Sequence, residues 1–207
     1  MGVLYPDYGV WRVGFVLIMT TAERLTRENW LEMGLHLLGA EGEKALTIER
    51  LCQVANRTKG SFYHHFKNRD EFINALLDYW QSEYTSRIIS TVEQLDNLSD
   101  RRRELDRLAA SIDNQIERAI RNWSSVDEQV KQVLKRVDEK RINYLAQLIA
   151  ELVQLDEEMA FELAIVEYAV FVGVQHLFPN ADAQWIERVF CRVTQMTALL
   201  SNQAQNV

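Results

Sequence analysis

Apolar side chains recur every three or four residues along most of the chain, the spacing that places them on one face of an α-helix. Trp30, Met33, Leu37 and Leu38 give a clear example. Runs that alternate apolar and polar residues between hairpin turns, which are typical of strands, do not occur. Only 2 prolines and 8 glycines interrupt the 207 residues. The sequence therefore predicts an all-α protein.

Polar residues that cap helices predict where the helices begin. Thr26, Thr47 and Thr58 each carry a hydroxyl that can accept a first-turn N–H, and Asn68 with Glu71 has the spacing of a capping box. Gly39 and Gly42 are expected to end the first helix. About nine helices are expected, over residues 27–42, 48–55, 59–66, 69–88, 104–123, 126–135, 137–155, 159–178 and 183–202.

The second and third helices are joined by a turn of only three residues, Asn56-Arg57-Thr58. Such a tight turn often needs one residue with positive φ, and asparagine is the best candidate other than glycine. In the next helix, Phe62 and Phe66 lie four residues apart and are expected to point inward. The sequence thus predicts two short helices at an angle, followed by a long helix that leaves the first domain.

Charge distinguishes this helical pair from the rest of the chain. The protein has 30 Asp and Glu against 23 Lys and Arg, a formal net charge of -7. Between Arg50 and Arg69, however, there is no acidic residue, and this segment also holds Arg57, Lys59 and Lys67. A compact basic, aromatic-bearing helical pair in an acidic protein indicates a DNA-reading surface.

The last two helices, 159–178 and 183–202, are apolar on more than one side, so each needs two packing partners. One partner is the core of its own chain, and the other is expected to be the same helix pair of a second copy. A fully internal pair in a monomer is the alternative. The predicted interface residues are Val170, Val174, Trp185, Val189, Val193 and Met196.

Other features point to no cofactor or metal site. Cys52 and Cys191 lie far apart, outside any metal-ligand spacing, and are expected to be reduced cysteines, with redox sensing as the alternative. The apolar run Val10–Ile18 is a poor signal peptide, and no apolar run reaches the ~18 residues of a membrane span. Residues 1–22 are predicted to be a flexible N-terminal extension, and the protein is expected to be cytoplasmic and not membrane-bound.

Two charged groups are expected to be ordinary surface features. The run Arg101-Arg102-Arg103, which is followed by Glu104 and Asp106, is typical of a solvated helix face. Asp138 and Arg141, three residues apart, are expected to form a surface pair. No Gly-rich phosphate loop, metal-ligand spacing or nucleophile–base signature is present, so the sequence does not favour an enzyme.

The segment LTIERLCQVANRTKGSFYHHFKNRDEF, residues 46–72, resembles the helix-turn-helix signature of the TetR family of bacterial transcriptional regulators. The resemblance covers about residues 24–75 and is weaker beyond. Asn56-Arg57-Thr58 stands where the family has Gly-Val-Ser, and Cys52 stands where it has Ala. Arg57 is the unusual residue, since it either weakens packing against the first helix or adds a phosphate contact.

The resemblance implies roles for individual residues in binding double-stranded operator DNA. Thr47, Ser61, Tyr63 and His65 look like phosphate contacts, and Arg69 stands where the family has a further one. Lys59, Gly60 and His64 look like base-edge readers. Thr58 caps the reading helix and is also expected to bind DNA, because the N–H groups at Thr58–Gly60 form an anion site at the helix start. A homodimer would present two such helices about 34 Å apart, matching a palindromic operator.

The resemblance also implies a division into a helix-turn-helix domain over residues 23–70 and a ligand-binding and dimerisation domain over residues 71–207. In the family, a small-molecule effector in the second domain tilts the connecting helix and releases the DNA. The predicted pocket residues are Trp80, Tyr84, Trp123, Tyr144 and Tyr168, each of which could equally be a core aromatic. The protein is thus expected to be a repressor; a ligand-independent architectural or protein-regulated DNA-binding protein is the alternative.

Overall fold

The computed structural model describes residues 25–204, and these residues fold into helices without any strand. The predicted all-α class is therefore confirmed. The elements are α1 (Arg27–Glu41), α2 (Ile48–Ala55), α3 (Lys59–Tyr63), α4 (Arg69–Gln81), α5 (Arg87–Glu93), α6 (Leu98–Ala110), α7 (Asn114–Ser124), α8 (Glu128–Val153), α9 (Glu157–Leu177) and α10 (Ala183–Ala204), with a 3-10 turn at Glu43–Ala45 and a π-helical turn at Ser82–Ser86. The predicted extension, residues 1–22, lies outside the described residues.

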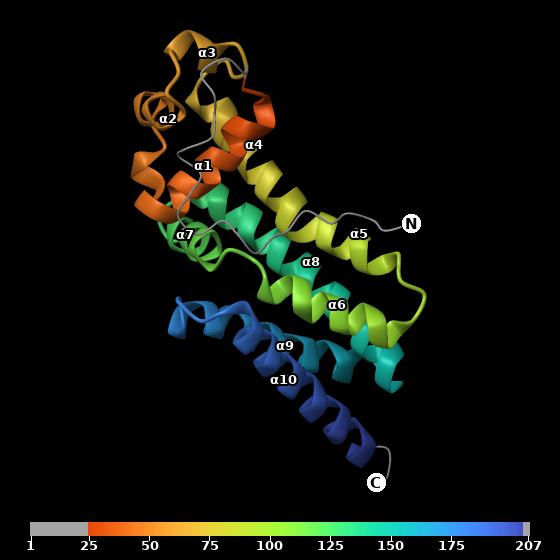
Figure 1. Cartoon of the computed structure of the whole chain (residues 1–207). Helices are drawn as coiled ribbons and strands as arrows, with labels where there is room; N and C mark the ends of the chain where they lie inside the picture. Colours follow the sequence, from red (N-terminus) through yellow and green to blue (C-terminus); the bar gives the residue numbers. More distant parts are fainter. Residues whose placement is uncertain (1–24, 205–207) are drawn as a thin grey trace.

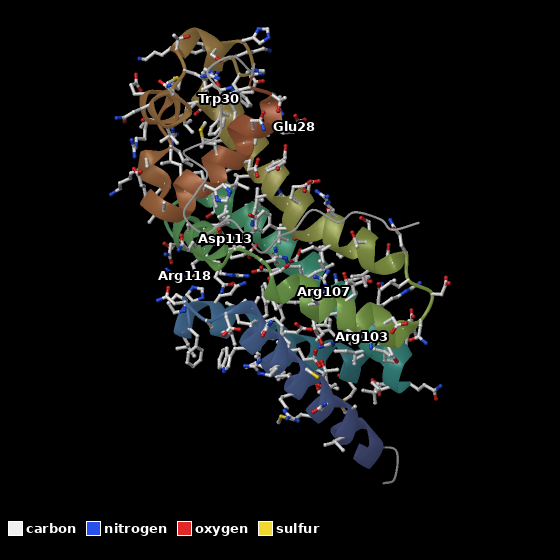
Figure 2. The ribbon with its side chains drawn as sticks, viewed as in Figure 1. Glu28, Trp30, Arg103, Arg107, Asp113 and Arg118 are labelled. Atoms are coloured by element: carbon white, nitrogen blue, oxygen red, sulfur yellow. The ribbon has the colours of Figure 1, made fainter. Side chains whose placement is uncertain are left out.

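Helices α1 to α4 form an N-terminal group around aromatic side chains. Trp30, Phe62 and Phe72 are fully buried, and the Trp30 and Phe62 rings meet edge to face with centroids 5.5 Å apart. Phe66 is 1% exposed and packs against Phe72 in the same way, at 5.1 Å. Figure 2 shows Trp30 inside this group. The inward direction predicted for Phe62 and Phe66 is confirmed.

The predicted caps are present. The hydroxyl of Thr26 accepts the Asn29 N–H at 3.2 Å, Thr47 caps α2 and Thr58 caps α3 in the same way. Asn68 accepts the Glu71 N–H at 2.8 Å and α4 begins at Arg69. These side chains satisfy N–H groups that a helix leaves without a partner in its first turn.

Only one of the two glycines expected to end the first helix does so. Gly42 follows α1 with φ of 80°, a conformation that side chains disfavour. Gly39 instead lies inside the helix, where a Cβ would come within 3.2 Å of the Ile116 side chain. Its role is therefore close packing of α1 against α7.

The helix that leaves the N-terminal group changes its winding on the way. Helix α4 continues through the π-helical turn Ser82–Ser86 into α5 without a break. Figure 1 shows α2 and α3 at one end of the molecule, α5, α6 and α8 in the middle, and α9 and α10 at the opposite end. The expected helix over 69–88 is present, but its apolar spacing does not predict the π-helical turn.

Two predicted helix boundaries in the middle of the chain are wrong. The helix expected over 104–123 is two helices, because Asp113 interrupts it and caps α7 by accepting the Gln115 N–H at 2.8 Å. The two helices expected over 126–135 and 137–155 are one, α8. The apolar row that contains Val130, Val133 and Val137 is buried without interruption, so packing holds the helix together across the junction.

Helix α9 has an apolar side that its own chain does not cover. It packs against α8 and α10, yet Ile165 and Val166 are 44% and 57% exposed. By length and composition alone this helix could cross a membrane, with a mean hydropathy of 1.4 over its most apolar window. A core helix of a soluble protein meets the same criteria, so this is weak evidence for a membrane span.

Candidate nucleic-acid interface and ligand cavity

The turn between α2 and α3 is built as the sequence predicted. Asn56 has φ of 49° and ψ of 49°, the left-handed conformation, and it ends α2. The Arg57 N–H donates to the carbonyl of Cys52 at 2.9 Å, so the chain turns directly into α3. The Arg57 guanidinium donates to the Asn56 carbonyl at 3.1 Å and the residue is half-buried. The turn therefore accepts Arg57 without losing its geometry.

One side of α3 faces solvent and carries the predicted DNA-contacting residues. Lys59, Gly60 and His64 are exposed, and Tyr63 has an exposed fraction of 51% although it is a large aromatic residue. Ser61 and His65 are half-buried. Phe62 and Phe66 are buried in the core and fix the position of this short helix. The exposed side chains therefore project from a fixed backbone. The arrangement presents hydroxyl, imidazole and ammonium donors, which suit phosphate oxygens and base edges.

Two basic residues at the predicted DNA-binding surface form ion pairs with nearby acidic residues. The sequence did not predict these pairs. Lys59 pairs with Glu49 of α2, and Arg50 donates to both oxygens of Glu41, at 2.5 and 3.1 Å. The hydrogen bond that Lys59 donates to Glu49 raises the pKa of Lys59 above its ordinary value. The absence of acidic residues between Arg50 and Arg69 concealed these pairs, because both carboxylates come just before that segment.

Arg69 has a partner within the chain as well. Its Nε donates to the carbonyl of Leu46 at 2.6 Å, which ties the start of α4 to the residue before the α2 cap. The residue as a whole remains exposed. Arg69 is thus first of all a structural link, and its predicted phosphate contact would have to use the rest of the guanidinium.

Comparison with known proteins agrees with this geometry. The family model for bacterial regulatory proteins of the tetR family matches residues 31–76, from α1 into α4. Residues 31–76 are thus similar to the conserved N-terminal segment of the tetR family. A curated relative, the uncharacterized HTH-type transcriptional regulator YwcC of Bacillus subtilis (strain 168), is 30% identical over 84 residues, which are 41% of this chain and 37% of that protein. The match thus spans little more than a third of the relative's length.

Solved structures of TetR-like regulators share the whole fold. A TetR-family transcriptional regulator from Streptomyces coelicolor superposes with a TM-score of 0.67 at 15% identity, covering 83% of this chain and 87% of its own. AibR, in complex with isovaleryl coenzyme A and operator DNA, has a TM-score of 0.61 at 15% identity, covering 86% and 97%. The family model and the curated relative are both described as regulators, in agreement with the sequence prediction.

A cavity of about 90 Å³ lies in the C-terminal part, between the π-helical turn, α5, α6, α8, α9 and α10. Three of the five predicted pocket aromatics, Tyr84, Tyr144 and Tyr168, line it. Trp80 and Trp123 do not line it and instead belong to the core, with exposed fractions of 0% and 4%. Val193, predicted for the dimer interface, also lines the cavity.

A buried charge cluster adjoins the cavity. The prediction that Asp138 and Arg141 form a surface pair is wrong, because each has a different partner in this cluster. Arg141 donates to both oxygens of Glu117 at 2.9 Å, and Glu117 also accepts the Trp80 Nε1–H at 3.0 Å. Asp138 pairs with Arg121 instead, at 2.8 Å. The two residues share a helix face, but that face is covered by α7, so each finds its partner there.

The hydroxyl of Tyr168 joins the two pairs of this cluster. It donates to Asp138 at 2.7 Å and accepts from Arg121, the partner of Asp138, at 2.9 Å. It also accepts from Arg141 of the other pair at 3.4 Å. Burial raises the pKa of Tyr168 to about 12, so the phenol stays neutral at ordinary pH. With two guanidinium groups and two carboxylates, the cluster is balanced in charge.

A second buried charge cluster forms around Arg102. The prediction that the arginines at 101–103 form a solvated helix face is therefore wrong for Arg102. Arg103 and Arg107, labelled on α6 in Figure 2, pair with residues of their own helix and are half or more exposed. Arg102 is only 6% exposed and contacts two carboxylates, Asp106 at 3.1 Å and Glu167 of α9 at 2.6 Å. Three successive arginines on a helix face different directions, so a run of them does not define one surface.

Proposed function

We propose that this protein is a repressor that binds a palindromic DNA operator as a homodimer and is released by a small-molecule effector bound in the cavity. The observation that carries the DNA-binding part is the exposed row of Lys59, Tyr63 and His64 on a helix fixed from behind by Phe62 and Phe66. The match of residues 31–76 to the tetR family model agrees with it. AibR, which shares the fold, is complexed with both operator DNA and a coenzyme A ester, so this architecture can carry both ligands.

The uncovered apolar side chains of α9 and α10 support a homodimer. Met196 and Leu199 of α10 are 62% and 65% exposed. Ile165 and Val166 of α9 are exposed as well. A second copy would remove these side chains from water, which is favourable by roughly 25 cal/mol per Å² of apolar surface. Of the six residues predicted for the interface, Met196 is the most exposed, whereas Val174 is 6% exposed and already packs within the chain.

The cavity is placed where a ligand could influence the DNA-binding end. Tyr84 and Thr85 of the π-helical turn line it, and this turn continues α4, the helix that enters the N-terminal group. Arg141 holds the turn by donating to the Tyr84 carbonyl at 3.0 Å and to the Thr85 hydroxyl at 2.9 Å. A π-helical turn is frequent at functional sites. A ligand that shifts it would move α4, and with it the spacing of the two reading helices.

Light scattering and DNA binding test this proposal. The full chain is expected to be a dimer at micromolar concentration, and Met196→Asp is expected to shift it toward the monomer and to weaken operator binding. Val126→Asp is the matched control, because Val126 is 76% exposed but lies between α7 and α8. A monomeric wild-type chain, or equal effects of the two substitutions, would contradict the dimer.

A further inference from the structure

The cavity wall combines apolar surface with a few buried charges. Ile88, Leu105 and Leu145 give it aliphatic surface, and the rings of Tyr168 and Phe171 stack beside it with centroids 5.5 Å apart. The charged residues on the wall are Arg102, Asp106, Arg141 and Glu167. Because the apolar surface offers little selectivity, the state of these four groups decides which ligand charge the cavity accepts.

Arg141 is already committed to partners within the chain. Its Nε donates to the Thr85 hydroxyl, Nη1 donates to Glu117 and Tyr168, and Nη2 donates to Glu117 and the Tyr84 carbonyl. A guanidinium has five N–H donors, and five bonds account for them. An anionic ligand could bind Arg141 only by displacing one of these bonds.

The Arg102 cluster is not balanced. One guanidinium serves two carboxylates, Asp106 and Glu167, and the side chains of the three residues are 8%, 13% and 4% exposed. Hydroxyl groups of α10 complete the cluster: Thr197 donates to Glu167 at 2.6 Å, and Thr194 donates to Asp106 at 3.3 Å. No second cation among the described residues pairs with either carboxylate. When both carboxylates are ionised, one negative charge at the cavity wall is uncompensated.

A buried charge without a counter-charge is unfavourable, and an ion of opposite sign removes the cost. The charge state of Asp106 reflects this: burial raises its pKa above the ordinary value, against the opposing effect of Arg102. An organic cation in the cavity would supply the missing charge. The faces of the surrounding aromatic rings would stabilise the same cation, since the ring quadrupole attracts positive charge.

We propose that the cavity binds a small organic cation, an ammonium group on a short apolar body, with Glu167 and Asp106 as its counter-charge. This inference rests on the proposed function, because it names the class of effector for the same site. The volume limits the size: about 90 Å³ is less than the ~150 Å³ of a cavity that holds benzene. An amine with about four carbon atoms therefore suits the cavity better than a drug-sized molecule.

Three isosteric probes separate charge from shape: isobutylamine, isobutanol and isobutyrate, titrated calorimetrically into the full chain. We expect isobutylamine to bind at least about tenfold more tightly than isobutanol, and isobutyrate to bind most weakly. Equal affinity for all three, tighter binding of isobutyrate, or no measurable binding of isobutylamine at millimolar concentration would overturn the proposal.

Substitution of the counter-charge locates the site. Glu167→Gln is expected to weaken isobutylamine about tenfold and to leave isobutanol within about twofold. Glu162→Gln, an exposed carboxylate on the same helix, is the matched control and should change neither. Asp106→Asn provides a second test should Glu167→Gln fail to fold, which thermal unfolding of each variant detects. A parallel loss of both ligands in the Glu167 variant would contradict the assignment.

The same samples separate this inference from the proposed function. Operator binding without any amine tests the DNA-binding role alone. If the protein binds DNA but does not bind the amine more tightly than the alcohol, the cation assignment is wrong and the DNA-binding role is retained. If the amine binds as expected but does not change DNA affinity, the cation site stands and the effector role fails.

Discussion

The two ends of this protein handle charge in opposite ways. At the DNA-binding end, Lys59 and Arg50 lie on the surface and pair with exposed carboxylates that can be exchanged for phosphates. In the C-terminal part, Arg102 and Arg141 are buried among carboxylates with exposed fractions near zero. Exposed pairs contribute little to stability, whereas a buried charge that loses its partner costs several kcal/mol. Substitutions of charged residues at the DNA-binding end should therefore change binding, whereas substitutions in the C-terminal part should first change folding.

The largest effect is expected at the balanced cluster. Glu117→Gln leaves the buried guanidinium of Arg141 without its carboxylate and should lower the free energy of unfolding by about 3–5 kcal/mol, measured by urea denaturation. Glu139→Gln removes a carboxylate from the exposed pair with Lys135 on α8 and should cost less than about 1 kcal/mol. Similar costs for the two variants would show that burial does not separate the two kinds of charge.

The next effect is expected on DNA binding. Lys59→Ala should weaken operator affinity by about 1–3 kcal/mol and should leave the free energy of unfolding within about 0.5 kcal/mol. Lys135→Ala, a similarly exposed lysine on α8, is the control and should leave affinity unchanged. Fluorescence anisotropy at several salt concentrations measures both. If Lys59→Ala destabilised the fold and left DNA affinity intact, the contrast between the two ends would be reversed.

A pH titration tests the unbalanced cluster, in which Arg102 of α6, Glu167 of α9 and Thr194 of α10 face Asp106. Since burial raises the pKa of Asp106, the folded state binds more protons than the unfolded state between the ordinary and the raised value. This group therefore lowers stability as pH rises through that interval. Asp106→Asn removes the effect, so its stability relative to the wild type should improve as the pH rises above the ordinary pKa of an aspartate. A difference that does not change with pH would contradict the charge imbalance.

The smallest effect is expected at the turn. Asn56→Gly should change the free energy of unfolding by no more than about 0.5 kcal/mol, because both residues accept the left-handed conformation. Asn56→Ala should cost about 1 kcal/mol in the same conformation. Thermal denaturation of the two variants measures the difference, and equal stability of the alanine and glycine variants would contradict the role assigned to Asn56.

The same contrast explains what could be predicted from the sequence. Asn56 and Thr58 act through neighbours three or four residues away, so their roles follow from local spacing. Arg102 and Arg141 meet Glu167 and Glu117, residues of other helices far along the chain, and no local pattern indicates such pairs. Local rules therefore described the DNA-binding end and misjudged the buried charges.

The wrongly predicted helix boundaries also reflect packing that local sequence patterns do not indicate. Packing of the apolar row on α8 overrides the polar residues that suggested a break, and the π-helical turn has no composition of its own. Of the five aromatics proposed for the pocket, Trp80 and Trp123 belong to the core because aromatic character alone does not distinguish a cavity wall from a packed interior.

A selection of DNA sites from a random-sequence library with the full chain tests whether this protein binds a palindromic operator through α3. We expect an enriched palindrome whose half-sites lie about one helical turn apart, and the loss of that enrichment in Tyr63→Ala, whose exposed ring lies on α3. No enriched sequence with the wild-type chain, or the same palindrome with equal affinity for the Tyr63→Ala variant, would contradict it.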